Sequence, residues 1–295
     1  MSEDQGGSAN IAFVGCGNLG MAILSRAIRS EVIDPATTVV IERDTGRQAE
    51  ARRLGVRVTA DAAAARGAQG VVLAVKPQHF LEAAQAIGSL SGATCVVSVM
   101  AGWSSAAIRA ALGGGSGGGG GGSDGPRVVR AMPNMAAQVG LSMTAVARGA
   151  GATSDDVTAA LRLFSAIGKA VEIPEALIDA AVAAVGSAPA YLYLLAEAQI
   201  AAAETMGFDA VTARAMAIES IFGAATLLAT DGREPAQLRA AVTSAGGTTA
   251  AAVNVFERGE FVALVAAAME AARAQRGTRE VNRATPFASA RHERI

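Results

Sequence analysis

Short runs of β-branched residues alternate with Ala-rich stretches of helical character through the first half of this chain. The pattern predicts strands at Ile11–Val14, Thr38–Ile41, Val71–Val75, Thr94–Val99 and Arg127–Arg130, with two more at Ser142–Ala147 and Ala170–Ile173. It predicts helices at Leu19–Ser30, Asp44–Leu54, Pro77–Ile87, Ser104–Leu112 and Asp155–Ile167. Apolar strands separated by crossover helices are typical of a parallel sheet with helices on both faces. The first half is therefore expected to be an α/β domain.

The chain changes character after Pro174, where the strand signals end. Helices are predicted at Glu175–Val185, Ala188–Met206, Ala210–Ala229, Pro235–Val242, Thr249–Glu257 and Phe261–Gln275. We therefore expect a sheet domain over residues 10–173 and an all-helical domain over residues 174–282. A small domain of long Ala-rich helices often buries its faces against a second copy, which predicts a homodimer formed through the helical domain.

Two segments are expected to lie outside the regular structure. Residues 113–125, which are Gly and Ser apart from Asp124, predict an expanded surface loop, and residues 283–295 predict a frayed tail.

Charge and composition exclude several classes of function. The chain has 25 Lys and Arg against 26 Asp and Glu, a net charge of −1, so no nucleic-acid partner is expected. Residues 83–108 are uncharged but divided by Gly and Ser, and residues 180–196 are short and interrupted, so no membrane span is expected. Residues 1–10 do not resemble a signal peptide, and two Cys cannot form a disulfide framework, which favours the cytoplasm. No Cys, His and Asp cluster has the spacing of a metal site.

The strongest local motif is Gly15-Cys16-Gly17-Asn18-Leu19-Gly20, which follows the first predicted strand and opens the first predicted helix. Glycines at this spacing permit a tight turn, the close approach of the backbone to a pyrophosphate, and close packing of helix on strand. The free N–H groups at the start of the helix then face the phosphates. This context predicts a Rossmann-type dinucleotide-binding domain.

The choice of dinucleotide depends on the end of the second predicted strand. Glu42 or Asp44 would accept hydrogen bonds from the ribose hydroxyls of NAD, whereas Arg43 would pair with the 2′-phosphate of NADP. We expect NADP or NAD as the cofactor, with NADPH favoured.

Two later strand ends are expected to complete the cofactor site, because ligands of such sheets bind outside the carboxyl ends of the strands. The residues concerned are Ala74, Val75, Lys76 and Pro77 after one strand and Met100, Ala101 and Gly102 after the next. Lys76 is either a cofactor contact or a solvated charge. Neither His79, at the start of a helix, nor His292, in the tail, is expected to donate a proton.

Five segments occur in the order and spacing of a known family over residues 10–280: Gly15–Gly20, Leu73–Gln78, Arg130–Asn134, Gly186–Tyr191 and Leu238–Thr249. On these segments the chain resembles the pyrroline-5-carboxylate reductases, and general Rossmann dehydrogenases lack the last of them. The resemblance implies reduction of 1-pyrroline-5-carboxylate to L-proline with NAD(P)H, the last step of proline biosynthesis. It also implies an interlocked homodimer or a higher oligomer such as a decamer, with active sites where the sheet domain meets the helical domain.

A substrate site is expected at the segment Gly246-Gly247-Thr248-Thr249, directly before an apolar helix. The N–H groups and the positive dipole end of such a helix suit a small carboxylate. The predicted substrate-binding residues are Ser244, Gly246, Gly247, Thr248 and Thr249. Thr249 matches the family's proposed acid, and we expect it to orient the imine or relay a proton from water, since a neutral Thr is a poor acid. One of the two threonines is also expected to cap the helix.

The chain departs from the family's usual residues at several positions: Ala245 stands for Pro, Ala188 for Gly, Met135-Ala136 for Thr-Pro, and Ala62 for an Asn that contacts the cofactor ribose. These departures keep a cofactor-binding paralogue with degraded catalysis open as an alternative. A related imine or β-hydroxyacid reductase is a second alternative. A β-hydroxyacid dehydrogenase normally needs a Lys on the first long helix of its second domain, and Ala188–Met206 contains none.

Overall fold

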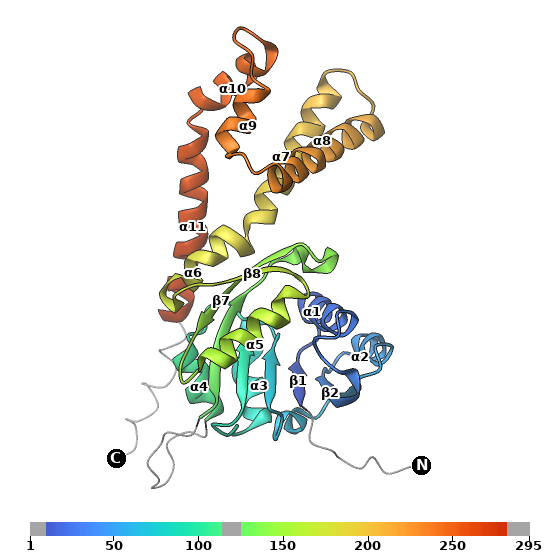
Figure 1. Cartoon of the computed structure of the whole chain (residues 1–295), viewed down its shortest axis with the longest axis vertical. Helices are drawn as coiled ribbons and strands as arrows, with labels where there is room; N and C mark the ends of the chain where they lie inside the picture. Colours follow the sequence, from blue (N-terminus) through green and yellow to red (C-terminus); the bar gives the residue numbers. More distant parts are fainter. Residues whose placement is uncertain (1–9, 114–124, 282–295) are drawn as a thin grey trace, which may run out of the picture. The chain divides into compact units, whose positions relative to one another are not determined.

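The computed structural model describes residues 10–113 and 125–281. The expected Gly-rich loop, apart from its two end residues, and the whole expected tail lie outside the described residues. The described chain forms two compact units (Figure 1): Ala188–Ala272 is one, and the remaining described residues are the other.

The first unit extends further along the sequence than the expected boundary at residue 173. Ile178 and Ala181 are buried together with Met132 and Ala145 of the sheet. The segment after Pro174 is therefore helical, as expected, but it packs as part of the sheet unit as far as Ser187.

The first unit is built on one eight-stranded sheet with the order β3-β2-β1-β4-β5-β6-β7-β8. Its strands are β1 (Ile11–Val14), β2 (Thr38–Ile41), β3 (Arg57–Thr59), β4 (Gly70–Leu73), β5 (Cys95–Ser98), β6 (Arg127–Met132), β7 (Ser142–Arg148) and β8 (Gly168–Glu172). Every expected strand is present, and β3 is an addition that the sequence pattern did not indicate.

The sheet is parallel except where β6 pairs with β7 in the antiparallel sense. The linker between these strands contains only the 3₁₀ helix η4 (Met135–Val139). A parallel return needs a longer crossover connection, so the short linker forces β7 to run back along β6. The expected parallel sheet is thus present, and this pairing is its one antiparallel exception among the described strands.

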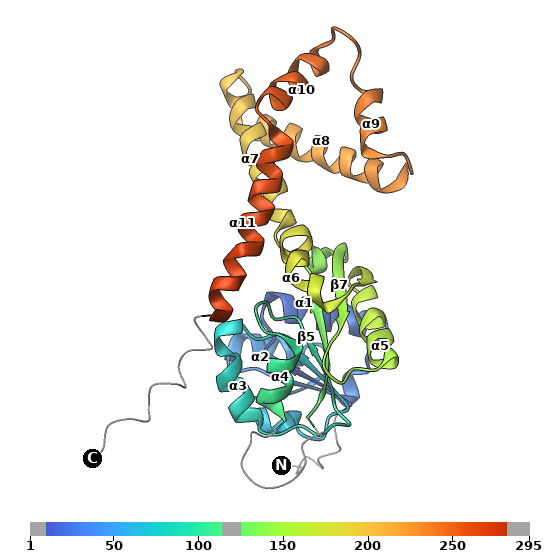
Figure 2. The same cartoon turned by 90° about the vertical axis from the view of Figure 1, so that its left-hand side faces the viewer.

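Helices cover both faces of the sheet. They are α1 (Asn18–Arg29), α2 (Thr45–Arg52), α3 (Phe80–Ile87), α4 (Ser105–Leu112), α5 (Ser154–Ser165) and α6 (Ile178–Ala181), with short turns η1 (Pro35–Thr37), η2 (Ala62–Ala65), η3 (Pro77–His79), η5 (Glu175–Leu177) and η6 (Val182–Gly186). Phe13 of β1 belongs to the buried cluster under α1 and α5, and its neighbour Val14 belongs to the cluster under α3 and α4. Figure 2 shows α3 and α4 on one side of the sheet and α5 on the other. This alternation along the strand separates two apolar cores.

A partly buried ion pair joins α5 to the sheet. The Arg127 guanidinium donates to both carboxylate oxygens of Asp156, from Nε at 2.8 Å and from Nη2 at 3.0 Å. Asp156 also closes a capping box, since it accepts from the backbone N–H of Thr153 at 2.8 Å while its own N–H donates to the Thr153 hydroxyl at 3.2 Å. Burial raises the pKa of the Asp156 carboxyl, but the bonds from Arg127 and Thr153 outweigh it and bring the pKa to about 2, below the ordinary 3.8.

The lowered pKa of Asp156 predicts a loss of stability in acid. A carboxyl group with a depressed pKa stabilises the fold above its unfolded pKa, and this contribution disappears as the pH falls from about 4 towards 2. The shift corresponds to roughly 2 kcal/mol of unfolding free energy. An Asp156→Asn variant should therefore be less stable than wild type at pH 7, and the gap should shrink below pH 4. Thermal melts followed by circular dichroism across this range measure it, and a gap that stays constant contradicts the prediction.

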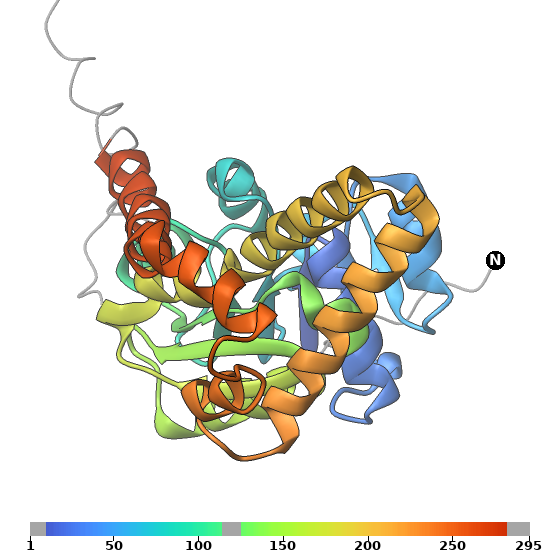
Figure 3. The same cartoon turned by 90° about the horizontal axis from the view of Figure 1, so that it is seen from above.

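The second unit is entirely helical, as expected. It contains α7 (Ala188–Thr205), α8 (Ala210–Thr230), α9 (Pro235–Ala241), α10 (Thr248–Arg258) and most of α11 (Phe261–Val281). In Figure 3, α7 and α8 are the two long helices drawn in ochre and orange, joined by a short turn. Neither α7 nor most of α8 is buried within this chain, and large apolar side chains such as Leu194 and Phe222 are 67% and 64% exposed.

Two helical segments are long and apolar enough to cross a membrane, judged by length and composition alone: Glu175–Thr205 and Ala210–Thr230. From the sequence we expected no membrane span. The first is not one regular helix, because it passes through η5, α6 and the π-helical turn η6 before α7 begins. Long apolar helices of this kind also occur where a protein packs against a second copy of itself.

Candidate functional site

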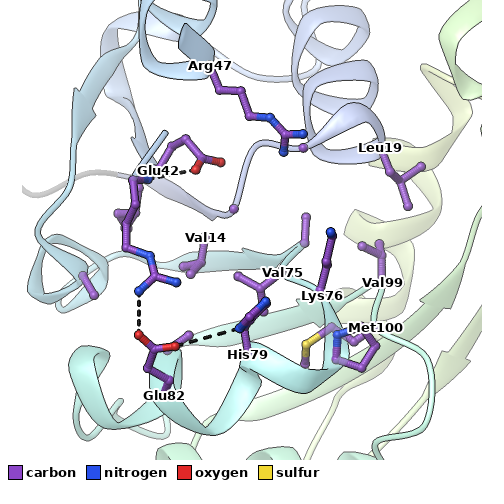
Figure 4. A pocket seen from close by; sticks show the side chains of 18 of the residues that line it. Val14, Leu19, Glu42, Arg47, Val75, Lys76, His79, Glu82, Val99 and Met100 are labelled. Atoms are coloured by element: carbon purple, nitrogen blue, oxygen red, sulfur yellow. Dashed lines mark hydrogen bonds and ion pairs between the residues drawn. The ribbon is translucent and has the colours of Figure 1, made fainter. Parts of the chain in front are cut away.

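The sheet order creates a crevice at the carboxyl ends of β1 and β4. The chain passes from β1 outwards to β2 and β3 on one side, and then returns to place β4 on the other side of β1. Open parallel sheets bind ligands where the strand order reverses in this way. A cavity of about 860 Å³ lies here (Figure 4), lined by the segments that follow β1, β2, β3, β4 and β5.

Most of the predicted cofactor residues line this cavity. They are Gly15, Gly17, Asn18 and Leu19 from the turn after β1; Glu42 and Arg43 after β2; Ala74, Val75, Lys76 and Pro77 after β4; and Met100 and Ala101 after β5. Cys16, Gly20 and Gly102 are not among the lining residues. Ala62, where the family usually has Asn, also lines the cavity. Figure 4 shows the side chain of Lys76 beside Val75.

The turn after β1 needs glycine for steric reasons. Gly15 has a φ of +86°, and a Cβ at this position would lie 2.9 Å from Cγ1 of Val75 and 3.0 Å from its backbone nitrogen. Gly20 is buried, and a Cβ there would lie 2.7 Å from the carbonyl oxygen of Gly15. The glycines therefore bring α1, the turn and β4 into close contact, which leaves the helix start open towards the cavity.

Cys16 packs within the turn, and its thiol is not reactive. Its side chain is buried, and burial, followed by the charges of Glu42 and Glu50, raises the pKa of the thiol to about 12. The nucleophilic thiolate form is therefore absent near neutral pH.

Glu42 braces the turn through its carboxylate. One oxygen accepts from the backbone N–H of Cys16 at 2.8 Å, and the other accepts from the N–H groups of Arg43 at 2.8 Å and Asp44 at 3.0 Å. Both oxygens are thus already hydrogen-bonded to backbone donors that tie the end of β2 to the turn after β1. Asp44 is the N-cap of α2, accepting from the N–H of Arg47 at 2.9 Å.

Three charged residues that sequence reasoning missed line the same cavity: Arg47, Asp61 and Glu82. Arg47 reaches over the turn, since a Cβ on Gly17 would lie 2.8 Å from its Nη1 atom. Glu82 on α3 pairs with Arg43 at 2.5 Å and lies 3.9 Å from Nδ1 of His79. Figure 4 draws both interactions of Glu82 as dashed lines. The sequence offered one indication that Arg47 lies near the cavity, its place in the first turn of the helix α2.

The segment Arg130–Asn134, which carries part of the family resemblance, has a structural role in the first unit. Buried Arg130 pairs with Asp179 at 3.2 Å and with Glu175 at 3.8 Å. The Asn134 side chain donates to the carbonyl oxygen of Val185 at 3.3 Å. These contacts fix the helical segment after residue 174 onto the end of β6.

The predicted substrate segment lies at the start of α10 in the second unit. Gly246 has a φ of +73°, and the backbone N–H of Gly247 donates to the carbonyl oxygen of Ser244 at 3.0 Å. Gly247 is the N-cap, so the expectation that Thr248 or Thr249 caps the helix is wrong. Both threonines are exposed in the first turn, and no side chain of the described residues caps this helix. The first N–H groups of a helix have no partner within it, which leaves these donors available to an anion.

No group of three or more His, Cys, Asp or Glu side chains that could hold a metal ion occurs within residues 10–113 and 125–281. His79 lines the cofactor-side cavity beside Glu82, and His292 lies outside the described residues.

Comparisons with known proteins cover both units. Residues 10–102 match a family model described as NADP oxidoreductase coenzyme F420-dependent, and residues 175–278 match one described as pyrroline-5-carboxylate reductase dimerisation. A pyrroline-5-carboxylate reductase of Corynebacterium melassecola is 37% identical over 261 residues, which cover 85% of this chain and 93% of that protein. The one from Methanosarcina acetivorans is 34% identical over 253 residues, covering 84% and 89%.

A solved structure shows the same arrangement of elements. The pyrroline-5-carboxylate reductase of Coxiella burnetii superimposes with a TM-score of 0.80 at 30% identity, covering 92% of this chain and 98% of that chain. The sequence relatives and this structure agree with the resemblance carried by the glycine turn and the segment before α10. The chain belongs to the pyrroline-5-carboxylate reductase family.

Proposed function

We propose that this protein reduces 1-pyrroline-5-carboxylate to L-proline with hydride from NAD(P)H, the last step of proline biosynthesis. The observation that carries the proposal is the match to enzymes of this name at 34–37% identity over more than four-fifths of the chain. The family models match residues 10–102, around the cavity, and residues 175–278, which include α10. The two free thiols, Cys16 and Cys95, suit a reducing compartment, and we place the enzyme in the cytoplasm.

The residues around the cavity fit a dinucleotide. The close contact between Gly15 and Val75 and the open start of α1 are what a pyrophosphate needs, and Lys76 and Arg47 add positive charge beside them. When bound, the reduced nicotinamide supplies the hydride for the C=N carbon. NADPH is favoured over NADH because Arg43 stands at the end of β2 while the Glu42 carboxylate is hydrogen-bonded to the backbone.

The start of α10 provides the substrate contacts in this proposal. The uncapped N–H groups of its first turn bind the carboxylate, with Ser244, Gly246 and Gly247 shaping the turn in front of it. The Thr249 hydroxyl hydrogen-bonds the ring nitrogen, and it orients the imine or passes on a proton from water. Its neutral hydroxyl is a poor acid, so we assign Thr249 a positioning and relay role.

The proposal is tested by adding 1-pyrroline-5-carboxylate to the purified protein with NADPH or NADH and following absorbance at the nicotinamide band together with proline formation. Turnover to proline is the expected result. A folded protein that binds NADPH but forms no proline would instead be the cofactor-binding paralogue suggested by Ala245, Ala188 and Ala62.

We also propose that a second copy of the chain covers the exposed apolar faces of α7 and α8. The match of residues 175–278 to a dimerisation family supports this, and it accounts for helices that would otherwise present Leu194 and Phe222 to water. Sedimentation velocity should show a dimer or a larger assembly, up to the decamer that the family resemblance implies.

A charge placed on this surface should weaken the assembly. Phe222 lies on α8 and is 64% exposed in the single chain, so Phe222→Asp should raise the dimer dissociation constant by about 100-fold or more. Leu81→Asp, at a 56% exposed helical position of the first unit, is the matched control and should leave the assembly intact. A Phe222 variant whose dissociation constant, measured by sedimentation over a dilution series, equals that of the wild type would contradict the proposed dimer surface.

A further inference from the structure

Glu82 occupies an unusual place for a carboxylate in a cavity that should accept phosphates. It projects from α3 into the cavity, and its Oε1 atom lies 2.5 Å from Nη1 of Arg43 (Figure 4). Arg43 directly follows Glu42 at the end of β2, where dinucleotide-binding sheets read the 2′ position of the adenosine ribose. Glu82 is thus paired with the side chain best placed to bind a 2′-phosphate.

The other cavity carboxylates are engaged differently. Glu42 accepts backbone N–H groups through both oxygens, and Asp61 accepts the backbone N–H of Ala63 at 2.9 Å as the N-cap of η2. Among the acidic residues of the described chain that line the cavity, Glu82 is therefore the one whose carboxylate lies against side chains, the Arg43 guanidinium and the His79 imidazole.

We propose that Glu82 determines cofactor specificity by competing with the 2′-phosphate of NADPH for the Arg43 guanidinium. This inference rests on the proposed NAD(P)H site. NADH carries a hydroxyl at this position and does not enter the competition. The carboxylate therefore lowers the affinity for NADPH selectively and narrows the preference for NADPH over NADH.

The exposure of the pair sets the size of the effect. The side chains of Arg43 and Glu82 are 67% and 60% exposed, and ion pairs in this environment are weak. A 2′-phosphate, with a charge of about −1.5 to −2, can therefore displace the carboxylate. His79 remains beside Glu82 as an alternative partner when Arg43 turns to the phosphate.

The test compares two probes of the adenosine half, adenosine 2′,5′-bisphosphate and 5′-AMP, by isothermal titration calorimetry on the full-length protein. The variant Glu82→Gln keeps the side-chain shape and removes the charge. It should lower the dissociation constant of the bisphosphate by about threefold, within the range of exposed ion pairs, and leave that of 5′-AMP unchanged. Dissociation constants for NADPH and NADH, from nicotinamide fluorescence, should change in the same way.

Two further variants make the result specific. Glu172→Gln removes the same charge from a second exposed pair, which Glu172 forms with Arg148 at 3.9 Å outside the cavity. This variant should leave the dissociation constants of both probes unchanged. In an Arg43→Gln background, Glu82→Gln should lose most of its effect, because the competition requires the guanidinium.

The proposal is overturned if Glu82→Gln weakens binding of the bisphosphate or changes the dissociation constants of both probes equally. It is also overturned if the substitution has the same effect on bisphosphate binding without Arg43 as with it. Failure of every variant and of the wild type to bind either probe, or either cofactor, would instead contradict the dinucleotide site itself. The two failures are thus distinguishable.

Discussion

A Gly15→Ala variant should bind NADPH at least about 100-fold more weakly than the wild type while remaining folded. The added Cβ meets Cγ1 of Val75 at 2.9 Å, the Val75 nitrogen at 3.0 Å and the Ala74 carbonyl carbon at 3.1 Å. Two of these atoms belong to the backbone after β4 and cannot rotate away, so the turn itself must move. An Ala at a φ of +86° adds strain of roughly 1–2 kcal/mol. A turn displaced from β4 no longer presents its N–H groups to the pyrophosphate.

The matched control for this variant is Gly55→Ala. Gly55 has a φ of +80° in the same unit, but its nearest neighbour would be Cβ of Pro35 at 3.8 Å, an ordinary contact. It should lose stability through backbone strain alone and keep its cofactor affinity. The two variants therefore separate strain from steric contact. Fluorescence titration with NADPH measures the affinity, and a Gly15→Ala protein within threefold of the wild type would contradict the assigned role of this turn.

The fold was predictable from sequence to the extent that its signals are local. The apolar run Ile11–Val14 and the glycines after it define a strand, a turn and a helix without reference to distant residues. The strand β3, by contrast, has the short sequence Arg57-Val58-Thr59 and exists because β2 offers it a partner. The antiparallel β7 likewise follows from the length of a linker, which the hydrophobic pattern does not report.

The site residues that directly follow a strand could be predicted from the sequence. The contacts between segments that are distant in the sequence could not. Arg43 was expected from its place after β2, but its partner Glu82 is 39 positions away on a helix whose orientation only the fold determines. Glu42 and Asp44 were both expected as possible ribose ligands, and that role stays a prediction. The structure adds that the Glu42 oxygens accept backbone N–H groups, a contact that no local sequence pattern reports. The proposed cofactor preference therefore rests on pairings that the sequence alone leaves open.

Replacement of Thr249 by Val should lower kcat for 1-pyrroline-5-carboxylate by about 10- to 100-fold, because the variant keeps the side-chain shape but cannot hydrogen-bond the ring nitrogen. The reaction should slow without stopping, since a neutral hydroxyl that positions the imine or relays a proton from water contributes less than a strong general acid. Thr249 is exposed and does not cap α10, so the loss should not arise from unfolding of the helix. Steady-state kinetics at saturating NADPH measure the effect.

Two companion variants decide whether the hydroxyl itself is responsible. Thr249→Ser retains the hydroxyl without the methyl group and should recover most of the activity. Thr230→Val removes another exposed hydroxyl, at the end of α8, where its bond is to the carbonyl oxygen of Thr226 at 2.9 Å, and should leave kcat unchanged. If Thr249→Val matched wild-type kcat, the ring nitrogen would have to receive its proton without this side chain. The start of α10 would then serve only to hold the carboxylate, through backbone N–H groups that no side-chain substitution removes.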